Sequence, residues 1–306
     1  MTKMIAALCA LLLFCAAANA APMRGQAVPS AATAKDAARF SQAVLRGGGG
    51  EREARAQLSV LVETNATADL TETFAPALRD LVTYTTVLAT YDDVLQNETD
   101  AAKQTFIRFN ILRTIVERAA FLPTTSRRAM LTRATNLAET LAKENKADAA
   151  VWESNGDLYA LQGDTATSES AYKRMASLDP AASARAGRKT GEAYQSVRNY
   201  GKARTAFESG IRADAASGGG KREKHLLYQA IASLSLAEGN TQGAIDALAL
   251  SGSAKPDATT PYSFRLDVAE ALLKRGYAKQ VREFAVRALE ITPGDPAATD
   301  LLARTK

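Results

Sequence analysis

The sequence predicts an all-α protein, a solenoid of helical hairpins preceded by a helical N-terminal region. Alanine is abundant and aromatic residues make up only 6% of the 306 residues, which suits closely packed helices better than sheets. Apolar residues recur at spacings of three and four, the period of a helix with one buried face. From Ala149 onward, one pattern of small and bulky residues starts near residues 149, 184, 225 and 262. Such a period is typical of a repeat array.

Bulk composition places the chain among ordinary globular proteins. It is 46% hydrophobic and 23% charged, and 38 Lys and Arg against 33 Asp and Glu leave a net charge of +5. No block of five like charges occurs, so the pattern indicates a mixed, solvated surface and argues against nucleic-acid binding. An acidic partner or an anionic membrane surface stays open as an alternative reading of the mild positive charge.

Residues 1–20 read as a signal peptide. Lys3 provides the positive start, Met4–Ala17 is an almost unbroken apolar run, and Ala18–Ala20 has small residues at the two positions that a signal peptidase inspects. Cleavage after Ala20 would make the protein periplasmic or secreted. The apolar run is shorter than the roughly 20 residues of a permanent membrane span, so we expect no stable span in the mature form.

The cysteine and histidine counts exclude several kinds of chemistry. Cys9 and Cys15 both lie in the signal peptide, so the mature chain would have no disulfide and no thiol ligand or nucleophile. Lipid attachment at Cys15 is the alternative, which bulky Phe14 disfavours. The single histidine, His225, is expected to be a helix cap or a surface residue. The sequence therefore predicts no metal site, no cofactor and no catalytic residue, and the protein is not expected to be an enzyme.

Residues 21–50 form a predicted flexible lead-in. Ala21–Ala34 is rich in Ala, Ser and Pro without an apolar period, and Lys35–Leu45 has the spacing of a short helix. Gly47–Gly50 then breaks that helix and is typical of a tether. A phosphate-binding loop is excluded because Glu51-Arg52 follows, where a Lys-Ser or Lys-Thr pair is needed.

Residues 51–147 predict a helical region of four or five helices without a clear repeat. Glu51–Glu63 and Thr73–Gln96 carry apolar stripes, and Asp100 is placed to cap a third helix that is apolar nearly all round. Pro123 ends that helix, and Thr124 or Thr125 is expected to cap the next. Tyrosines in the second stripe favour core packing over a ligand-stacking ladder, because their spacing is helical.

The first repeat unit, Ala149–Pro180, carries the clearest pattern. Small residues stand where two antiparallel helices would touch, and bulky residues stand where neighbouring units would meet. A turn at Gln162–Asp164 separates the two predicted helices. The residues that carry the pattern are Trp152, Gly156, Tyr159, Ser168, Tyr172 and Pro180.

Three further units follow the pattern less completely. The second has Gly187 where a bulky residue is expected and Ala215 in place of proline, the third has Ser235 in place of an aromatic residue, and the fourth has Arg265 at the first bulky position. A short closing helix, Pro296–Arg304, is expected to cover the last unit. The matching residues are Gly191, Tyr194, Ala203, Phe207, Tyr228, Ala232, Gly239, Ala244, Leu248, Ala269, Leu272, Gly276, Val281, Ala288 and Pro293.

On these residues, the segment 148–306 resembles the tetratricopeptide repeat (TPR) family. The resemblance covers about half of the mature chain and implies a concave groove, lined by the first helix of each unit, that binds a protein or peptide segment. By position in the repeat, the groove would be lined by Glu153, Asp157, Leu161, Arg188, Glu192, Gln195, Gln229, Ser233, Leu236, Glu270, Leu273 and Lys274. An ordinary solvated helix face is the alternative for each of them.

Acidic residues decide what the groove is expected to bind. Family members that clamp a partner's terminal carboxylate use Lys and Asn where this chain has Glu153 and Asp157, so that mode is excluded. Carboxylates beside Leu161, Leu236 and Leu273 favour an amphipathic or partly basic peptide. Glu153 and Asp157 lie four residues apart, a routine spacing on a solvated helix rather than an acid–base pair.

The sequence therefore predicts an exported, TPR-like adaptor or scaffold that acts in cell-envelope assembly or secretion, the last step by analogy with the family. Two alternatives stay open. The protein could be a structural subunit that self-associates through the groove, as a homo-oligomer or around its own N-terminal segment, or a hydrolase with an unrecognised site.

Overall fold

The structure is a computed structural model that describes residues 81–216, 221–253, 266–291 and 293–305. The described part consists of helices joined by short connections and contains no strand. It divides into two compact units, Met1–Asp164 and Thr165–Lys306. The predicted signal peptide, the lead-in and the first predicted helices of the N-terminal region lie outside the described residues.

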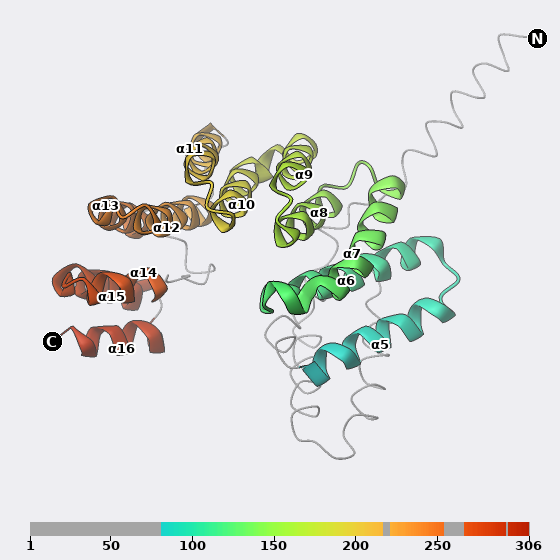
Figure 1. Ribbon diagram of the computed structural model, residues 1–306, viewed down its shortest axis with the longest axis horizontal. Coiled ribbons are helices and arrows are strands. Elements are labelled where there is room, and N and C mark those ends of the chain that lie inside the picture. The colour runs from blue at the N-terminus through green and yellow to red at the C-terminus, as the bar shows by residue number, and fades with distance from the viewer. Residues whose placement is uncertain (1–80, 217–220, 254–265, 292, 306) are drawn as a thin grey trace, which may run out of the picture. The chain divides into compact units, whose positions relative to one another are not determined.

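The first unit contains four described helices: α5 (Leu81–Asn97), α6 (Ala101–Ala120), α7 (Thr124–Glu144) and α8 (Ala149–Gln162). Helix α6 packs against each of the other three, as its apolar circumference predicts (Figure 1). Phe109, Ile111 and Leu112 of α6 have no exposed surface. Val151 and Leu158 of α8 join the same cluster, so the first helix of the first predicted repeat belongs with this unit.

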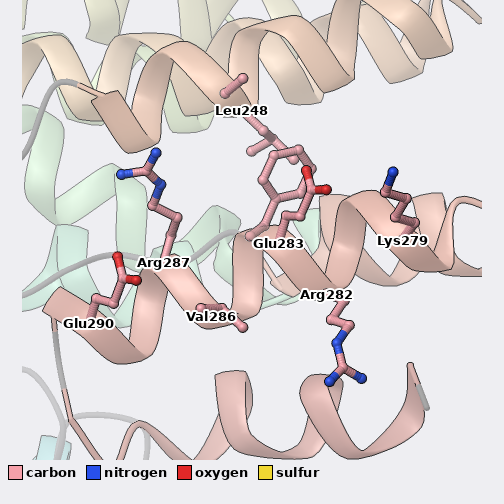
Figure 2. Close-up of a pocket in the computed structure, with 9 residues that line it drawn as sticks. Leu248, Lys279, Arg282, Glu283, Val286, Arg287 and Glu290 are labelled. Carbon is pink, nitrogen blue, oxygen red and sulfur yellow. The ribbon is translucent and has the colours of Figure 1, made fainter.

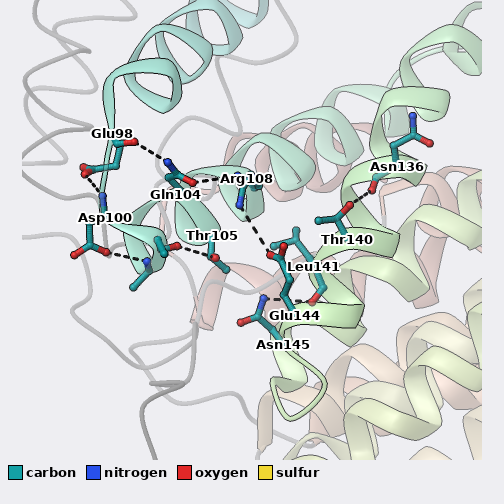
Figure 3. Close-up of polar contacts among 12 residues, drawn as sticks. Glu98, Asp100, Gln104, Thr105, Arg108, Asn136, Thr140, Leu141, Glu144 and Asn145 are labelled. Carbon is teal, nitrogen blue, oxygen red and sulfur yellow. Dashed lines mark hydrogen bonds and ion pairs between the residues drawn. The ribbon is translucent and has the colours of Figure 1, made fainter. Parts of the chain in front are cut away.

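Side chains at the start of α6 show how this unit is held locally (Figure 3). Asp100 caps the helix as predicted, because its Oδ1 accepts hydrogen bonds from the backbone N–H groups of Ala102 and Lys103 at 2.8 and 3.0 Å. Arg108 extends the polar contacts from α6 to Glu144 of α7, 4.0 Å away. Helix α7 begins differently from the prediction. Pro123 is its N-cap and makes no side-chain hydrogen bond, so neither Thr124 nor Thr125 caps it.

The described residues of the second unit form eight α-helices, whose bounds are α9 (Thr165–Leu178), α10 (Ser183–Ser196), α11 (Tyr200–Ala216), α12 (Lys221–Ala237), α13 (Thr241–Ser253), α14 (Leu266–Lys274), α15 (Ala278–Ile291) and α16 (Pro296–Arg304). A 3-10 turn, Pro180–Ala182, joins α9 to α10. The helices pack in the predicted pairs, α10 with α11, α12 with α13 and α14 with α15, while α12 also contacts α10 and α14 (Figure 1). Helix α16 covers α15 and contacts α14, which confirms the predicted closing helix.

Contacts at the repeat period confirm that the second unit is a solenoid. Several side-chain pairs join residues 34 to 38 positions apart, which is the length of one repeat, so similar positions of consecutive units lie side by side. The pairs are Arg188–Glu223, Gln195–Ser233, Arg204–Glu238, Thr241–Arg275 and Glu270–Arg304.

Helices α10 and α11 approach each other more closely than a side chain at their crossing would allow. A Cβ atom on Gly187 would lie 2.6 Å from the Gly210 Cα atom, and one on Gly191 would lie 2.4 Å from the Phe207 ring. Real Cβ atoms do not make such contacts. The close packing of α10 on α11 therefore explains why glycine stands at position 187, where the family pattern has a bulky residue.

His225 is not the cap or surface residue that the sequence predicted. Its ring is 1% exposed on α12 and faces α13, where Nδ1 lies 3.1 Å from the Ser251 carbonyl oxygen and 2.8 Å from Ser251 Oγ. Since the carbonyl only accepts hydrogen bonds, this geometry places the proton on Nδ1. Nε2 then accepts from the Gln229 amide at 3.0 Å. The histidine joins two helices of one repeat through a buried polar cluster in which both ring nitrogens are hydrogen-bonded and Gln229 Oε1 has no hydrogen-bond partner.

The turn between the two helices of each repeat requires one residue with a left-handed backbone. Gly163, Gly239 and Gly276 occupy this place in the first, third and fourth repeats, with φ of 83°, 80° and 89°. Arg198 occupies it in the second repeat, with φ of 61°. A Cβ atom makes this conformation costly, by roughly 1–2 kcal/mol. Arg198 is thus the strained member of the set.

We expect Arg198→Gly to raise the free energy of unfolding by about 0.5–1 kcal/mol, because relief of the strain exceeds the extra chain entropy that glycine brings to the unfolded state. Urea denaturation followed by circular dichroism measures the change. Arg198→Ala is the matched control, since it removes the same charge and keeps the Cβ atom. If the alanine variant gains as much stability as the glycine variant, backbone strain is not the cause.

Candidate protein-binding surfaces

The residues predicted to line the groove fall on the first helices of the repeats. In the second unit these are α10, α12 and α14, and the surface that their predicted residues share is called the first-helix surface below. Arg188 of α10 lies between two carboxylates on it: its Nε donates to Glu223 Oε2 at 2.9 Å and its NH1 to Glu192 Oε1 at 3.0 Å. Burial favours the neutral guanidine, yet the two carboxylates outweigh that effect and raise the pKa of Arg188.

A second trio of charges lies farther along the same unit. Arg304 of α16 donates from NH1 to Glu270 Oε1 at 3.2 Å and to Asp300 Oδ2 at 3.0 Å. The hydrogen bond to Asp300, with that to Glu270, raises the pKa of Arg304. Each trio therefore sets one cation against two carboxylates and has a net charge of −1.

The other predicted groove residues of the second unit differ in how open they are. Gln195 Nε2 donates to Ser233 Oγ at 3.1 Å, which links α10 to α12. Leu236 and Leu273 are half-buried, and Lys274 is exposed. Gln229 is 1% exposed and bonds His225, so its side chain does not line an open surface as predicted.

The three predicted residues in the first unit are less open than expected. Glu153 is 3% exposed, because it sits on the buried side of α8 together with Ser154 and Asn155. Asp157 is half-buried. Leu161 is half-buried and packs against the core of the first unit. Glu153 therefore does not offer its carboxylate to a partner in this structure.

A hollow that the sequence analysis missed lies on the other side of α10. At 3.6 residues per turn, Ala186, Gly187, Thr190 and Tyr194 face away from Arg188, Glu192 and Gln195. They form the floor of a groove of about 460 Å³ between α9 and α11, called the α9–α11 groove below. The small side chains of Ala176, Thr205, Ala206, Ser209 and Ala213 form its walls. The small residues Ala186, Gly187 and Thr190 on one face of α10 are the sequence signal that could have revealed it.

One end of the α9–α11 groove is charged. Glu169 of α9 accepts hydrogen bonds from the Tyr194 hydroxyl and from Lys173 Nζ, the latter at 2.7 Å. Lys202 Nζ lies 5.0 Å from the centre of the Tyr194 ring. The hydrogen bond from Lys173, with that from Tyr194, lowers the pKa of Glu169, while the bond to Glu169 raises the pKa of Tyr194 to about 12.

A second hollow of about 700 Å³ lies between α13 and α15. Figure 2 shows Lys279, Glu283 and Arg287 extending from α15 toward α13, while Arg282 points away from it. Leu248 and Val286 give the hollow an apolar part, and Val286 is 40% exposed. The lining carries three cations, Lys279, Arg282 and Arg287, and two carboxylates, Glu283 and Glu290, so charges of both signs are present in it.

The described residues offer neither a metal site nor a membrane-spanning helix. No group of three or more His, Cys, Asp and Glu side chains in the described helices could hold a metal ion. Among the same helices, none combines the length and apolar character needed to cross a bilayer.

Comparisons with known proteins give matches among solved structures alone, each at low identity. No family model matches the sequence, and no curated protein matches it. Solved structures that match include a tetratricopeptide repeat protein from Parabacteroides merdae (14% identity, 90% of this chain and 99% of that chain, TM-score 0.46), a chain of Naa15/Naa10 bound to HypK-THB (12%, 90% and 56%, 0.40) and the P58(IPK) TPR domain (12%, 89% and 97%, 0.25). At these TM-scores the similarities say nothing about partners.

The class of protein follows from the chain's own geometry. Helices pair in order, the turns recur at one position of each unit, and side-chain contacts recur at the repeat period. The described helices of the second unit therefore form a TPR-like solenoid of helical hairpins.

The Glu169 network predicts a pH dependence of stability. Because the pKa of Glu169 is lower in the folded state, its contribution is present above the ordinary glutamate pKa and is lost as pH falls through the folded value. We expect Glu169→Gln to lower the free energy of unfolding by less than about 1 kcal/mol at pH 6 and by progressively less toward pH 3.

Urea denaturation at pH 6, 4.5 and 3 measures this effect. Glu208→Gln on α11 is the control, since Glu208 is exposed and outside the α9–α11 groove. A Glu169→Gln difference that stays constant across the pH range contradicts the assignment.

Proposed function

We infer that this protein is an exported, non-enzymatic scaffold that binds a protein or peptide segment on its first-helix surface, in cell-envelope assembly or secretion. The observation that carries the inference is the pair of charge trios, Glu192–Arg188–Glu223 and Glu270–Arg304–Asp300. Each has one more carboxylate than its arginine neutralises. A partner that brings Lys or Arg side chains to both places would neutralise that excess.

Exposure decides which carboxylates a partner can reach. The Glu192 side chain is 42% exposed and that of Glu270 is 36% exposed. The Arg188 side chain is only 15% exposed, so it acts as the fixed internal cation of its trio. Leu236 of α12 and Leu273 of α14, both half-buried, offer apolar contact on the same helices that carry Glu223 and Glu270. An amphipathic peptide with basic residues flanking apolar ones matches this arrangement.

Export rests on the sequence of residues 1–20 alone. A positive start, a short apolar run and small residues before Ala21 support cleavage after Ala20. A mature chain without cysteine is then held together by its helix packing, without disulfides.

We expect the secreted or periplasmic form to begin at Ala21. N-terminal sequencing and intact-mass measurement of the protein recovered from its native compartment identify the first residue. Ala18→Leu together with Ala20→Leu should block cleavage and leave the precursor, since the peptidase requires small residues there. A chain that retains Met1 in its functional compartment contradicts export by this route.

We expect a fluorescein-labelled, 20-residue amphipathic peptide of Lys and Leu to bind the first-helix surface. Glu192→Gln with Glu270→Gln should weaken this binding about tenfold, because each lost carboxylate removes about 0.7 kcal/mol of attraction. Fluorescence anisotropy measures the dissociation constants.

Glu208→Gln with Glu283→Gln is the matched control. It removes the same two charges from second helices, α11 and α15, away from the first-helix surface. Equal weakening by both double variants shows that the peptide senses only net charge, and then the proposed surface is wrong.

A further inference from the structure

We propose that the α9–α11 groove is a second docking site, on the opposite side of α10 from the first-helix surface, and that its occupant is an acidic amphipathic helix of a partner protein. The juxtaposition that carries the proposal is a hollow lined by three helices, with small residues along its floor and a positively charged end. This goes beyond the proposed function, because a chain with two such surfaces holds two partners at once.

The shape of the groove fits a helix. Its lining comes from three helices, whose backbone N–H and C=O groups are already bonded along each helix. No strand edge is therefore present in the lining to pair with an extended peptide. The small side chains of Ala186, Thr190 and Ala206 and the bare Gly187 backbone allow a ridge of apolar side chains to enter between α9 and α11.

Small side chains, and not the absence of a side chain at Gly187, leave the space open. A Cβ atom on Gly187 would lie 2.6 Å from the Gly210 Cα atom, so the α11 backbone itself fills the place where the repeat pattern has a bulky residue. The hollow is left by the small side chains that line it, among them Ala186, Thr190 and Ala206.

The positive charge of the groove determines that its occupant should carry negative charge. Residues 165–216 contain nine Lys and Arg against five Asp and Glu, a net charge of +4 out of +5 for the whole chain. At the end of the groove, Lys173 and Lys202 outnumber Glu169. The Lys173 side chain is 74% exposed and can pair with a partner carboxylate while it keeps its contact with Glu169. An acidic helix is therefore attracted and a basic one is repelled.

The two surfaces of α10 thus prefer opposite charges. The first-helix surface has an excess carboxylate at Glu192 and Glu270, while the groove has an excess ammonium group at Lys173 and Lys202. One probe of each sign can test each surface separately. Failure of the groove proposal then leaves the proposed function intact, and the reverse also holds.

The test uses the full chain and a designed 20-residue helix with a Leu/Ala ridge and Glu on its remaining faces, labelled with fluorescein. Anisotropy titrations should show saturable binding, at least tenfold tighter than for the same peptide with Lys in place of Glu. Ser209→Phe, which puts a ring into the groove from an exposed position, should weaken binding at least tenfold. Lys202→Glu should weaken it by a similar factor.

Arg212→Glu is the matched control, since Arg212 is an exposed residue of the same helix α11 that does not line the groove. It should change the dissociation constant by less than threefold. Circular dichroism spectra and urea midpoints confirm that each variant is folded, and the Lys/Leu peptide should bind the Ser209→Phe variant as it binds the parent chain.

Three outcomes overturn the proposal. The first is that the acidic helix does not bind the parent chain. The second is that the Ser209→Phe variant binds it as tightly as the parent chain does. The third is that Arg212→Glu weakens binding as much as Lys202→Glu does. The last result would show attraction by overall charge without a defined site.

Discussion

The close approach of helices at small residues is the constraint on which the second unit depends. At the crossing of α10 and α11 the distance is set by backbone atoms, because Gly187 faces Gly210 and Gly191 faces the Phe207 ring. A larger residue at either place would push the two helices apart. Since each hairpin stacks on the next, the spacing at one crossing carries over to contacts made a whole repeat away, such as Gln195 with Ser233.

The same crossing also creates the surfaces on which binding is proposed. A solenoid uses the interior of each hairpin for stacking, so its outer helix faces are left for partners. On one side of α10, polar side chains form hydrogen-bonded pairs with residues of α12, the first helix of the next repeat. On the other side, small residues leave a hollow that the chain itself does not fill. One helix thus separates a polar surface from an apolar groove.

In the second unit, single charged side chains are shared by two hydrogen-bonding partners. Arg188 and Arg304 are each shared by two carboxylates, whereas Glu169 is approached by Lys173 and by the Tyr194 hydroxyl. Each shared charged side chain links neighbouring residues of the unit, and each cluster keeps a net charge whose sign is known. Such partly exposed pairs add little to stability, typically below about 1 kcal/mol each. They contribute more to deciding which partner is attracted.

The sequence by itself determined the helical class, the pairing of helices, the glycine turns and the Asp100 cap, because each of these follows from residues within a few positions of one another. Only the tertiary structure decided the burial of His225 and Gln229, the association of α8 with the first unit, and the side of α10 that stays hollow. These features depend on atoms supplied by residues that are distant in the sequence, such as Ser251, which lies 26 positions from His225. The pattern along a single helix shows which face has small residues. Whether a neighbouring helix fills the space above that face is decided only when the helices pack.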